Sequence, residues 1–226
     1  MPAVPQPNPG PGRPKDPGKR LAILEAAKKL FPRQGYDATS MDAIATEAGV
    51  SKLTVYSHFN DKESLFSAAV TERCEEQLPH AAFELGPDSG PIEARLREIA
   101  LRCHALVTSE EAIQLHRMMA ARAQHDARLA RLFFEAGPRR LLAEFEALLD
   151  RADATGLLRV ADPPQAAEHF YCLVKGLAHM QVLIGARPPL TTEQAGRHVE
   201  SVVALFLKAY GPEPEGTAAA PCRRSQ

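Results

Sequence analysis

Apolar residues begin to follow a helical period where the clustered prolines of the N-terminus end. The repeating positions, at three- and four-residue spacing, are Leu21, Leu24, Ala27 and Phe31. This spacing is typical of one face of an α-helix. Asp16 followed by Pro17 is a common helix start, because aspartate caps free backbone N–H groups and proline suits the first helical position. A helix is therefore predicted from residue 17 to Gly35, and Pro32 should end or kink its last turn.

Two shorter helical patterns follow, with a glycine between them. The apolar face of the first consists of Met41, Ile44, Ala45 and Ala48. Thr39, with Asp42 three residues later, forms a near capping box before it, and Gly49 ends it. Ser51 can cap the next stretch, KLTVYSHF. Helix, tight turn and helix are the layout of a helix-turn-helix.

The remainder of the chain keeps the same period and predicts an all-α protein. A helix continues from residue 64 to 78, three amphipathic stretches cross 92–136, and further helices cover 138–154, 163–185 and 192–209. The chain has no tryptophan and only 6% aromatic residues, whereas strands favour aromatic and β-branched residues. Residues 1–16 and 211–226 are rich in proline or glycine and lack apolar periodicity, so both ends are predicted to be disordered.

The predicted helix from Ser51 has two different faces. At about 100° per residue, Val55 and Phe59 lie on one side, which we expect to be the core side. Lys52, Leu53, Tyr56 and Ser57 fill the opposite arc. A cation, a phenol and short side chains suit docking into a DNA groove, although a solvated surface would have the same polarity.

The distribution of charge and cysteine along the chain bears on where the protein acts and on the chemistry it can perform. Residues 1–66 carry nine Lys/Arg against seven Asp/Glu (+2), while the rest carry eighteen against twenty-one (−3). The four cysteines are scattered without a Cys-x-x-Cys pair, and no long apolar run suggests a membrane span, so a cytoplasmic location is expected. The sequence contains no recognisable nucleophile elbow, zinc-finger spacing or His-Glu-x-x-His run, so neither catalysis nor a cofactor or metal is predicted.

The stretch AAKKLFPRQGYDATSMDAIATEAGVSKLTVYSHFNDKESLF, residues 26–66, resembles the DNA-binding domain of the tetracycline-repressor-like (TetR/AcrR) regulators. The coinciding elements, in order, are Phe31 to Tyr36, Thr39, Ala48 to Ser51, Tyr56, Phe59, Lys62-Glu63 and Leu65. The resemblance implies a DNA-binding domain at 17–63 and a helical ligand-binding and dimerisation domain at 64–210. The sequence departs from the common family pattern at two positions. Leu53 stands where a small residue is frequent, and Pro32 lies in the usually uninterrupted end of the first helix.

The resemblance also implies which residues meet a double-stranded DNA operator. The implied contacts to the DNA backbone or groove are Thr39, Ser51, Lys52, Thr54, Tyr56, His58 and Lys62, with Lys52, Leu53 and Ser57 nearest the bases. Lys62 stands in the first turn of its helix, where a cation is mildly unfavourable, and a phosphate partner would explain it. In the basic arm, Arg13 and Lys15 can enter a minor groove; a plain disordered tail is the alternative.

For the C-terminal part, the resemblance implies a homodimer through the last two helices and a small-molecule effector. The residues expected to line a mainly apolar pocket are Cys103, Met118, Met119, Phe134, Phe145, Tyr171, Lys175 and His179. Methionine and phenylalanine at helical spacing can equally be core.

The resulting hypothesis is a homodimeric repressor that binds a palindromic operator and is released by a small, largely apolar ligand. A helical carrier or enzyme without DNA binding is one alternative. A DNA-binding regulator without a small-molecule effector is the other.

Overall fold

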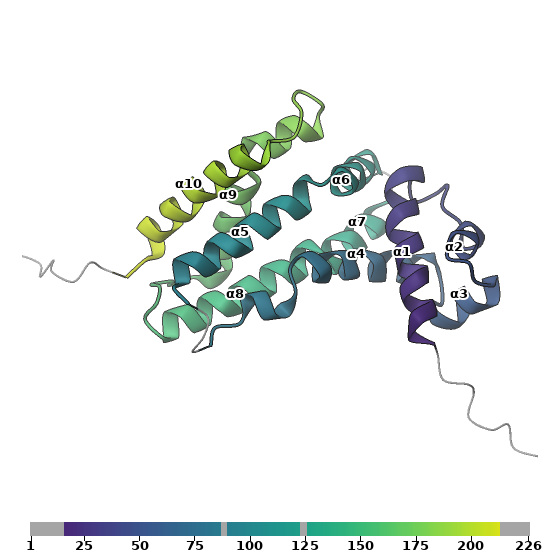
Figure 1. Cartoon of the computed structure of the whole chain (residues 1–226), viewed down its shortest axis with the longest axis horizontal. Helices are drawn as coiled ribbons and strands as arrows, with labels where there is room; N and C mark the ends of the chain where they lie inside the picture. The colour runs from purple at the N-terminus through teal and green to yellow at the C-terminus, as the bar shows by residue number, and fades with distance from the viewer. Residues whose placement is uncertain (1–15, 87–89, 123–125, 213–226) are drawn as a thin grey trace, which may run out of the picture. The chain divides into compact units, whose positions relative to one another are not determined.

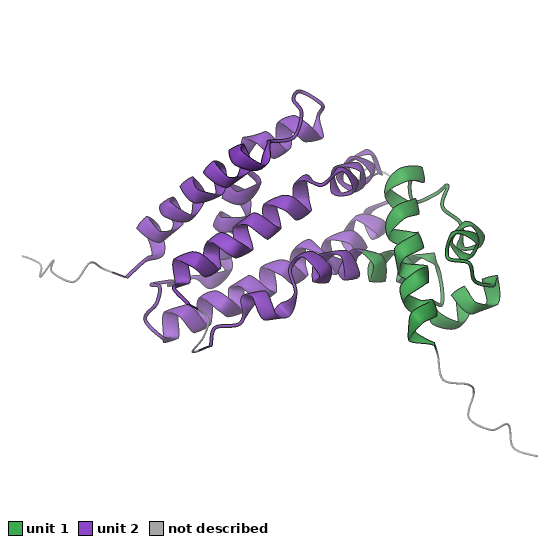
Figure 2. Ribbon diagram, in the orientation of Figure 1, with its two compact units in different colours: residues 1–69 green, residues 70–226 purple. Residues whose placement is uncertain are grey.

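The computed structural model describes residues 16–86, 90–122 and 126–212, and every regular element in these ranges is helical (Figure 1). This confirms the all-α prediction. The chain divides into two compact units, Met1–Ala69 and Val70–Gln226 (Figure 2). Arg13 and Lys15 lie outside the described residues, as do most of the two predicted disordered ends. No helix in the described part is long and apolar enough to cross a membrane.

The first unit contains α1 (Pro17–Gln34), α2 (Met41–Glu47), α3 (Lys52–His58) and the start of α4 (Lys62–Gln77). The Asp16 side chain caps α1 by accepting from the N–H of Gly18. The rings of Phe31, Tyr36 and Phe66 contact one another with centroids 5.1–5.7 Å apart. These aromatic contacts join the end of α1 to α4. Because α1 passes Pro32 and ends at Gln34, Pro32 does not end the helix.

The start of α2 differs from the prediction. Ser40 is the N-cap, and its hydroxyl oxygen accepts from the N–H of Ala43 at 3.0 Å. Thr39 is fully buried instead, and its hydroxyl donates to the carbonyl oxygen of Gly35 at 2.8 Å. Two hydroxyl residues in succession offer the same local capping chemistry, and the tertiary packing of Thr39 decides between them.

The second unit contains the rest of α4, the short 3₁₀-helix η1 (His80–Phe83) and six further helices. These are α5 (Ile92–Thr108), α6 (Glu110–Arg122), α7 (Ala127–Ala136), α8 (Pro138–Ala154), α9 (Pro163–Leu183) and α10 (Thr192–Tyr210). The core centres on Phe145, Phe170 and Phe206, with Phe145 stacked on Phe170 at 4.4 Å between centroids. This aromatic centre joins α8, α9 and α10.

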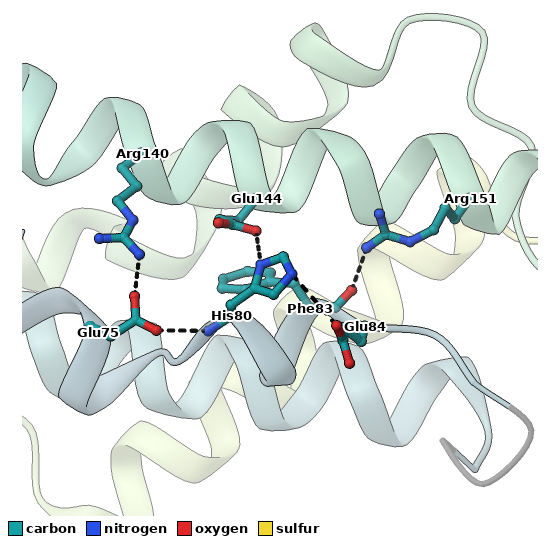
Figure 3. A network of polar contacts seen from close by, with 7 residues as sticks. All are labelled: Glu75, His80, Phe83, Glu84, Arg140, Glu144 and Arg151. Atoms are coloured by element: carbon teal, nitrogen blue, oxygen red, sulfur yellow. Dashed lines mark hydrogen bonds and ion pairs between the residues drawn. The ribbon is translucent and has the colours of Figure 1, made fainter.

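Polar contacts tie the end of α4 and η1 to α8 (Figure 3). Arg140 pairs with Glu75, and the ring Nδ1 of His80 lies 2.6 Å from a carboxylate oxygen of Glu144. Farther along α8, Arg151 donates to the carbonyl oxygen of Phe83 at 2.8 Å. These contacts fix the only stretch of 3₁₀-helix in the described residues against a long helix.

Candidate nucleic-acid interface and ligand site

The turn between α2 and α3 is built as a helix-turn-helix. Gly49 has φ 65°, which glycine adopts without steric cost. The N–H of Val50 donates to the carbonyl oxygen of Ala45 at 3.0 Å, and the Ser51 hydroxyl caps α3 by accepting from the N–H of Thr54 at 3.1 Å. Val55 is fully buried. The turn thus fixes which side of α3 faces inward.

The opposite side of α3 is exposed. Leu53 is 80% exposed and Tyr56 42% exposed, and Ser51, Lys52 and Ser57 are exposed with them. The Tyr56 hydroxyl forms no hydrogen bond with any described residue. A large aliphatic side chain and an unpaired phenol on one solvent-facing surface indicate a docking face rather than a packing face.

Lys52 is held near this face by an ion pair. Its Nζ lies 2.8 Å from Oδ1 of Asp42 on α2, and both side chains are about three-fifths exposed at 59% and 60%. The hydrogen bond and charge of Asp42 raise the pKa of Lys52. Lys52 is therefore a firmly charged cation whose partner is accessible to solvent.

Lys62, expected at a DNA phosphate, makes contacts within the first unit. Its Nζ donates to the carbonyl oxygen of Tyr36 at 2.8 Å and lies 4.3 Å from the centroid of the Tyr36 ring. Burial lowers the pKa of Lys62. The ammonium thus supports the connection between α1 and α2.

Three of the residues expected at DNA are less exposed than the outer face of α3. Thr39 is fully buried, while Thr54 and His58 are half-buried. The Thr54 hydroxyl lies 2.8 Å from that of Ser51, within the cap of α3. Ser40, which sequence reasoning missed, is exposed at the start of α2; its place directly before Met41 was the available signal.

In the second unit, half of the expected pocket residues come together with two that were missed. Cys103, Tyr171, Lys175 and His179 share a neighbourhood with His104 and His116, contributed by α5, α6 and α9. We name these six residues the polar cluster. In the sequence, the two missed histidines cannot be told apart from polar residues on the solvent side of a helix. The sequence therefore offered no signal for them.

The other four expected pocket residues are scattered. Phe145 belongs to the aromatic core, and Phe134 is 46% exposed. On α6, Met119 is buried and Met118 is half-buried.

Burial dominates the electrostatics of the polar cluster. It lowers the pKa of His116 to about 4 and also lowers the pKa of His104 and His179, since a charged ring loses solvation. It raises the pKa of the Cys103 thiol to about 12. At neutral pH these three histidines are therefore uncharged. Within the described ranges no group of three or more His, Cys, Asp and Glu side chains is arranged to hold a metal ion.

Exposed apolar side chains also lie on the last two helices. Leu177, Met180 and Ile184 of α9 are 73%, 53% and 66% exposed, and Leu205 of α10 is 52% exposed. On α9 the three follow at intervals of three and four residues, which places them on one side of the helix. We name these four residues the apolar stripe.

Comparison with known proteins gives matches to both units. The family model described as bacterial regulatory proteins, tetR family, matches residues 23–69. The model described as AefR-like transcriptional repressor, C-terminal domain, matches residues 94–212. The uncharacterised HTH-type transcriptional regulator YdeS of Bacillus subtilis is 33% identical over 152 residues, which are 66% of this chain and 71% of YdeS.

Two solved structures share the fold over nearly their whole length. A TetR-family transcriptional regulator from Mesorhizobium loti has a TM-score of 0.74 and 31% identity, covering 88% of this chain and 99% of its own. The flavonoid-responsive regulator FrrA has a TM-score of 0.67 and 33% identity, covering 88% of this chain and 100% of its own.

Proposed function

Because the chain belongs to the TetR family of bacterial transcriptional regulators, we propose that it is a homodimeric repressor that binds a palindromic operator and is released by a small, largely apolar ligand. The observation that carries the proposal is the exposed face of α3, which a helix-turn-helix presents to DNA. Such a regulator would act in the cytoplasm, the location expected from the sequence.

The proposed DNA contacts divide into two kinds. Lys52, Leu53 and Ser57 are proposed to face the base edges, where lysine can donate to guanine and leucine can meet a thymine methyl group. Tyr56 and Ser51 are proposed to reach phosphates, because both are exposed and carry hydroxyl groups. On binding, DNA would replace Asp42 as the partner of Lys52.

A second copy of the chain is proposed to cover the apolar stripe. Dimerisation would place two copies of α3 on successive major grooves, about 34 Å apart, and so explain a palindromic operator. The ligand is proposed to enter the second unit; the name of the relative FrrA, which is flavonoid-responsive, supports a small-molecule effector.

The proposal is tested by selecting bound duplexes from a random DNA pool with the purified protein. Enrichment of a palindrome is expected. Enrichment of no sequence, with only weak salt-sensitive binding, would contradict the proposal and favour a helical carrier or enzyme.

Two variants test the assignment of Lys52 in the same selection. Lys52→Ala should change which bases are enriched. Lys29→Ala is the matched control, since Lys29 of α1 is also an exposed lysine of the first unit, 52% exposed and ion-paired with Glu47 of α2. If both variants enrich the original palindrome equally well, Lys52 does not read bases.

A further inference from the structure

Three buried ring nitrogens of the polar cluster have no hydrogen-bond partner among the described residues: Nε2 of His104, Nδ1 of His116 and Nε2 of His179. The buried hydroxyl of Tyr171 also lacks a hydrogen bond of standard geometry and lies beside the Cys103 thiol. His104 is 4% exposed and Tyr171 8% exposed, so solvent does not reach them. More than nine in ten buried polar groups in proteins are hydrogen-bonded, and exceptions need an explanation such as a bound ligand.

These atoms lie close enough together to meet one small molecule. The rings of His116 on α6 and His179 on α9 are 5.4 Å apart between centroids. His104 on α5 is near enough to His179 for each charge to affect the other. On α9, Tyr171 and Lys175 are four residues apart before the break at Gly176 and therefore lie on one side of the helix, and the charge of Lys175 also acts on His179.

The charge of the cluster is unbalanced. Lys175 lies near Cys103, His116 and His179, and its positive charge disfavours the protonated form of each. Among the described residues, Lys175 has neither a hydrogen bond nor an ion pair, so no carboxylate neutralises it. The half-buried ammonium and the uncharged histidines around it offer donors and a positive charge to whatever enters.

The surroundings of the cluster are apolar. The ring of Phe133 contacts that of His116 edge-on, with centroids 5.7 Å apart. A molecule that reaches Lys175 would thus place its remaining surface against an aromatic side chain.

We propose that the polar cluster binds the effector through an anionic oxygen group, a carboxylate or phenolate, that is carried on an apolar body. Lys175 supplies the charge, and His116, His179 and Tyr171 supply hydrogen bonds. A purely apolar ligand would leave the buried ring nitrogens of His116 and His179 unpaired, and a cation would be repelled by Lys175. This inference rests on the proposed function, because it assigns the chemistry of the ligand that releases the operator.

The test uses matched aryl acids and amides: benzoate with benzamide, 2-naphthoate with 2-naphthamide, and 4-phenylbenzoate with 4-phenylbenzamide. Thermal unfolding of the full chain is measured with each compound, because a ligand that binds only the folded state raises its stability. At least one carboxylate should raise the unfolding temperature, and its amide should not. Equal effects of both members of every pair, or no effect of any compound, would overturn the proposal.

Variants then assign the charge. Lys175→Met should weaken binding of the active carboxylate at least about tenfold, the loss expected for a hydrogen bond to a charged group. Lys175→Arg should keep most of the affinity. Lys208→Met, at an exposed lysine of α10, is the matched control and should bind as the unaltered chain does. Operator binding without ligand shows that each variant is folded, and unchanged affinity in a folded Lys175→Met variant would refute the role of Lys175.

Operator release separates this inference from the proposed function. If a carboxylate stabilises the chain but leaves operator affinity unchanged, the anion site stands and ligand-induced release fails. If only neutral compounds release the operator, release stands and the anion site fails.

Discussion

The backbone break in α9 leads to a sharp prediction about stability. Gly176 has φ 60° and ψ 178° inside a helix, a conformation that is nearly restricted to glycine. A Cβ added there would lie 2.8 Å from Cε1 of His198 on α10. The same ring donates from Nε2 to the carbonyl oxygen of Val174 at 3.0 Å. Gly176→Ala therefore both strains the backbone and displaces the ring that satisfies this carbonyl.

The expected cost can be summed from these two effects. A non-glycine residue in this region costs about 1–3 kcal/mol. Loss of the His198 hydrogen bond adds about 1 kcal/mol. Gly176→Ala should thus lower the free energy of unfolding by about 2–4 kcal/mol, or the unfolding temperature by about 5–15 °C for a chain of this size.

Gly196→Ala provides the matched control. Gly196 lies inside α10, and a Cβ there would meet nothing within 4 Å. Alanine should stabilise the helix by about 0.5–1 kcal/mol. Urea unfolding followed by circular dichroism, at one fixed protomer concentration, measures both variants. If Gly176→Ala were as stable as Gly196→Ala, α9 would be free to straighten and the argument from the break would be refuted.

Three further predictions concern other regions. Leu177→Lys should raise the dimer dissociation constant about tenfold or more in sedimentation experiments, because burying a leucine side chain in the dimer interface is worth about 1.5–3 kcal/mol. Leu21→Lys, at an exposed leucine of the first unit, is the control and should leave the dissociation constant unchanged. The pKa of His116 is about 4 in the folded chain and 6.5 ordinarily, so the unfolded chain takes up the proton first as the pH falls. The free energy of unfolding should therefore decrease as the pH drops from 6.5 toward 4, by up to about 2 kcal/mol at pH 5. Urea unfolding at pH 8 and pH 5 should show that His116→Asn removes this part of the loss. Thr39→Val should lower the urea midpoint by the equivalent of about 1 kcal/mol, through loss of the bond to Gly35, and Thr39→Ser should not.

The helix-turn-helix was largely predictable because its signals are local. The spacing of Val55 and Phe59 placed both in the core, and Ser51 caps α3 as predicted. Lys62 shows the limit of local reasoning. Its position in the first turn of α4 suggested a phosphate partner but gave no sign of the hydrogen bond that it donates to the carbonyl oxygen of Tyr36, twenty-six residues earlier. A contact that depends on how α1 ends cannot be read from the helix that carries the lysine.

The faces of α9 were harder to predict for a specific reason. Phe170, Val174 and Leu177 continue one helical period, which in an unbroken helix would place all three on one face. The structure buries Phe170 and Val174 completely but leaves Leu177 73% exposed. The non-helical residue Gly176 lies between Val174 and Leu177 and changes the direction of the chain. A periodicity argument assumes an unbroken helix, so it fails at the break.

Residues of two different surfaces lie on α9 around the break. Lys175 precedes Gly176 and His179 follows it, and both belong to the polar cluster. Leu177, Met180 and Ile184, all after the break, form the α9 part of the apolar stripe. A molecule held by both Lys175 and His179 would span the break, and any change of the backbone angle there would move the stripe. The binding of the ligand and the geometry of the dimer would then be coupled through the break in α9. A ligand that binds more tightly at one backbone angle of the break would favour one arrangement of the dimer.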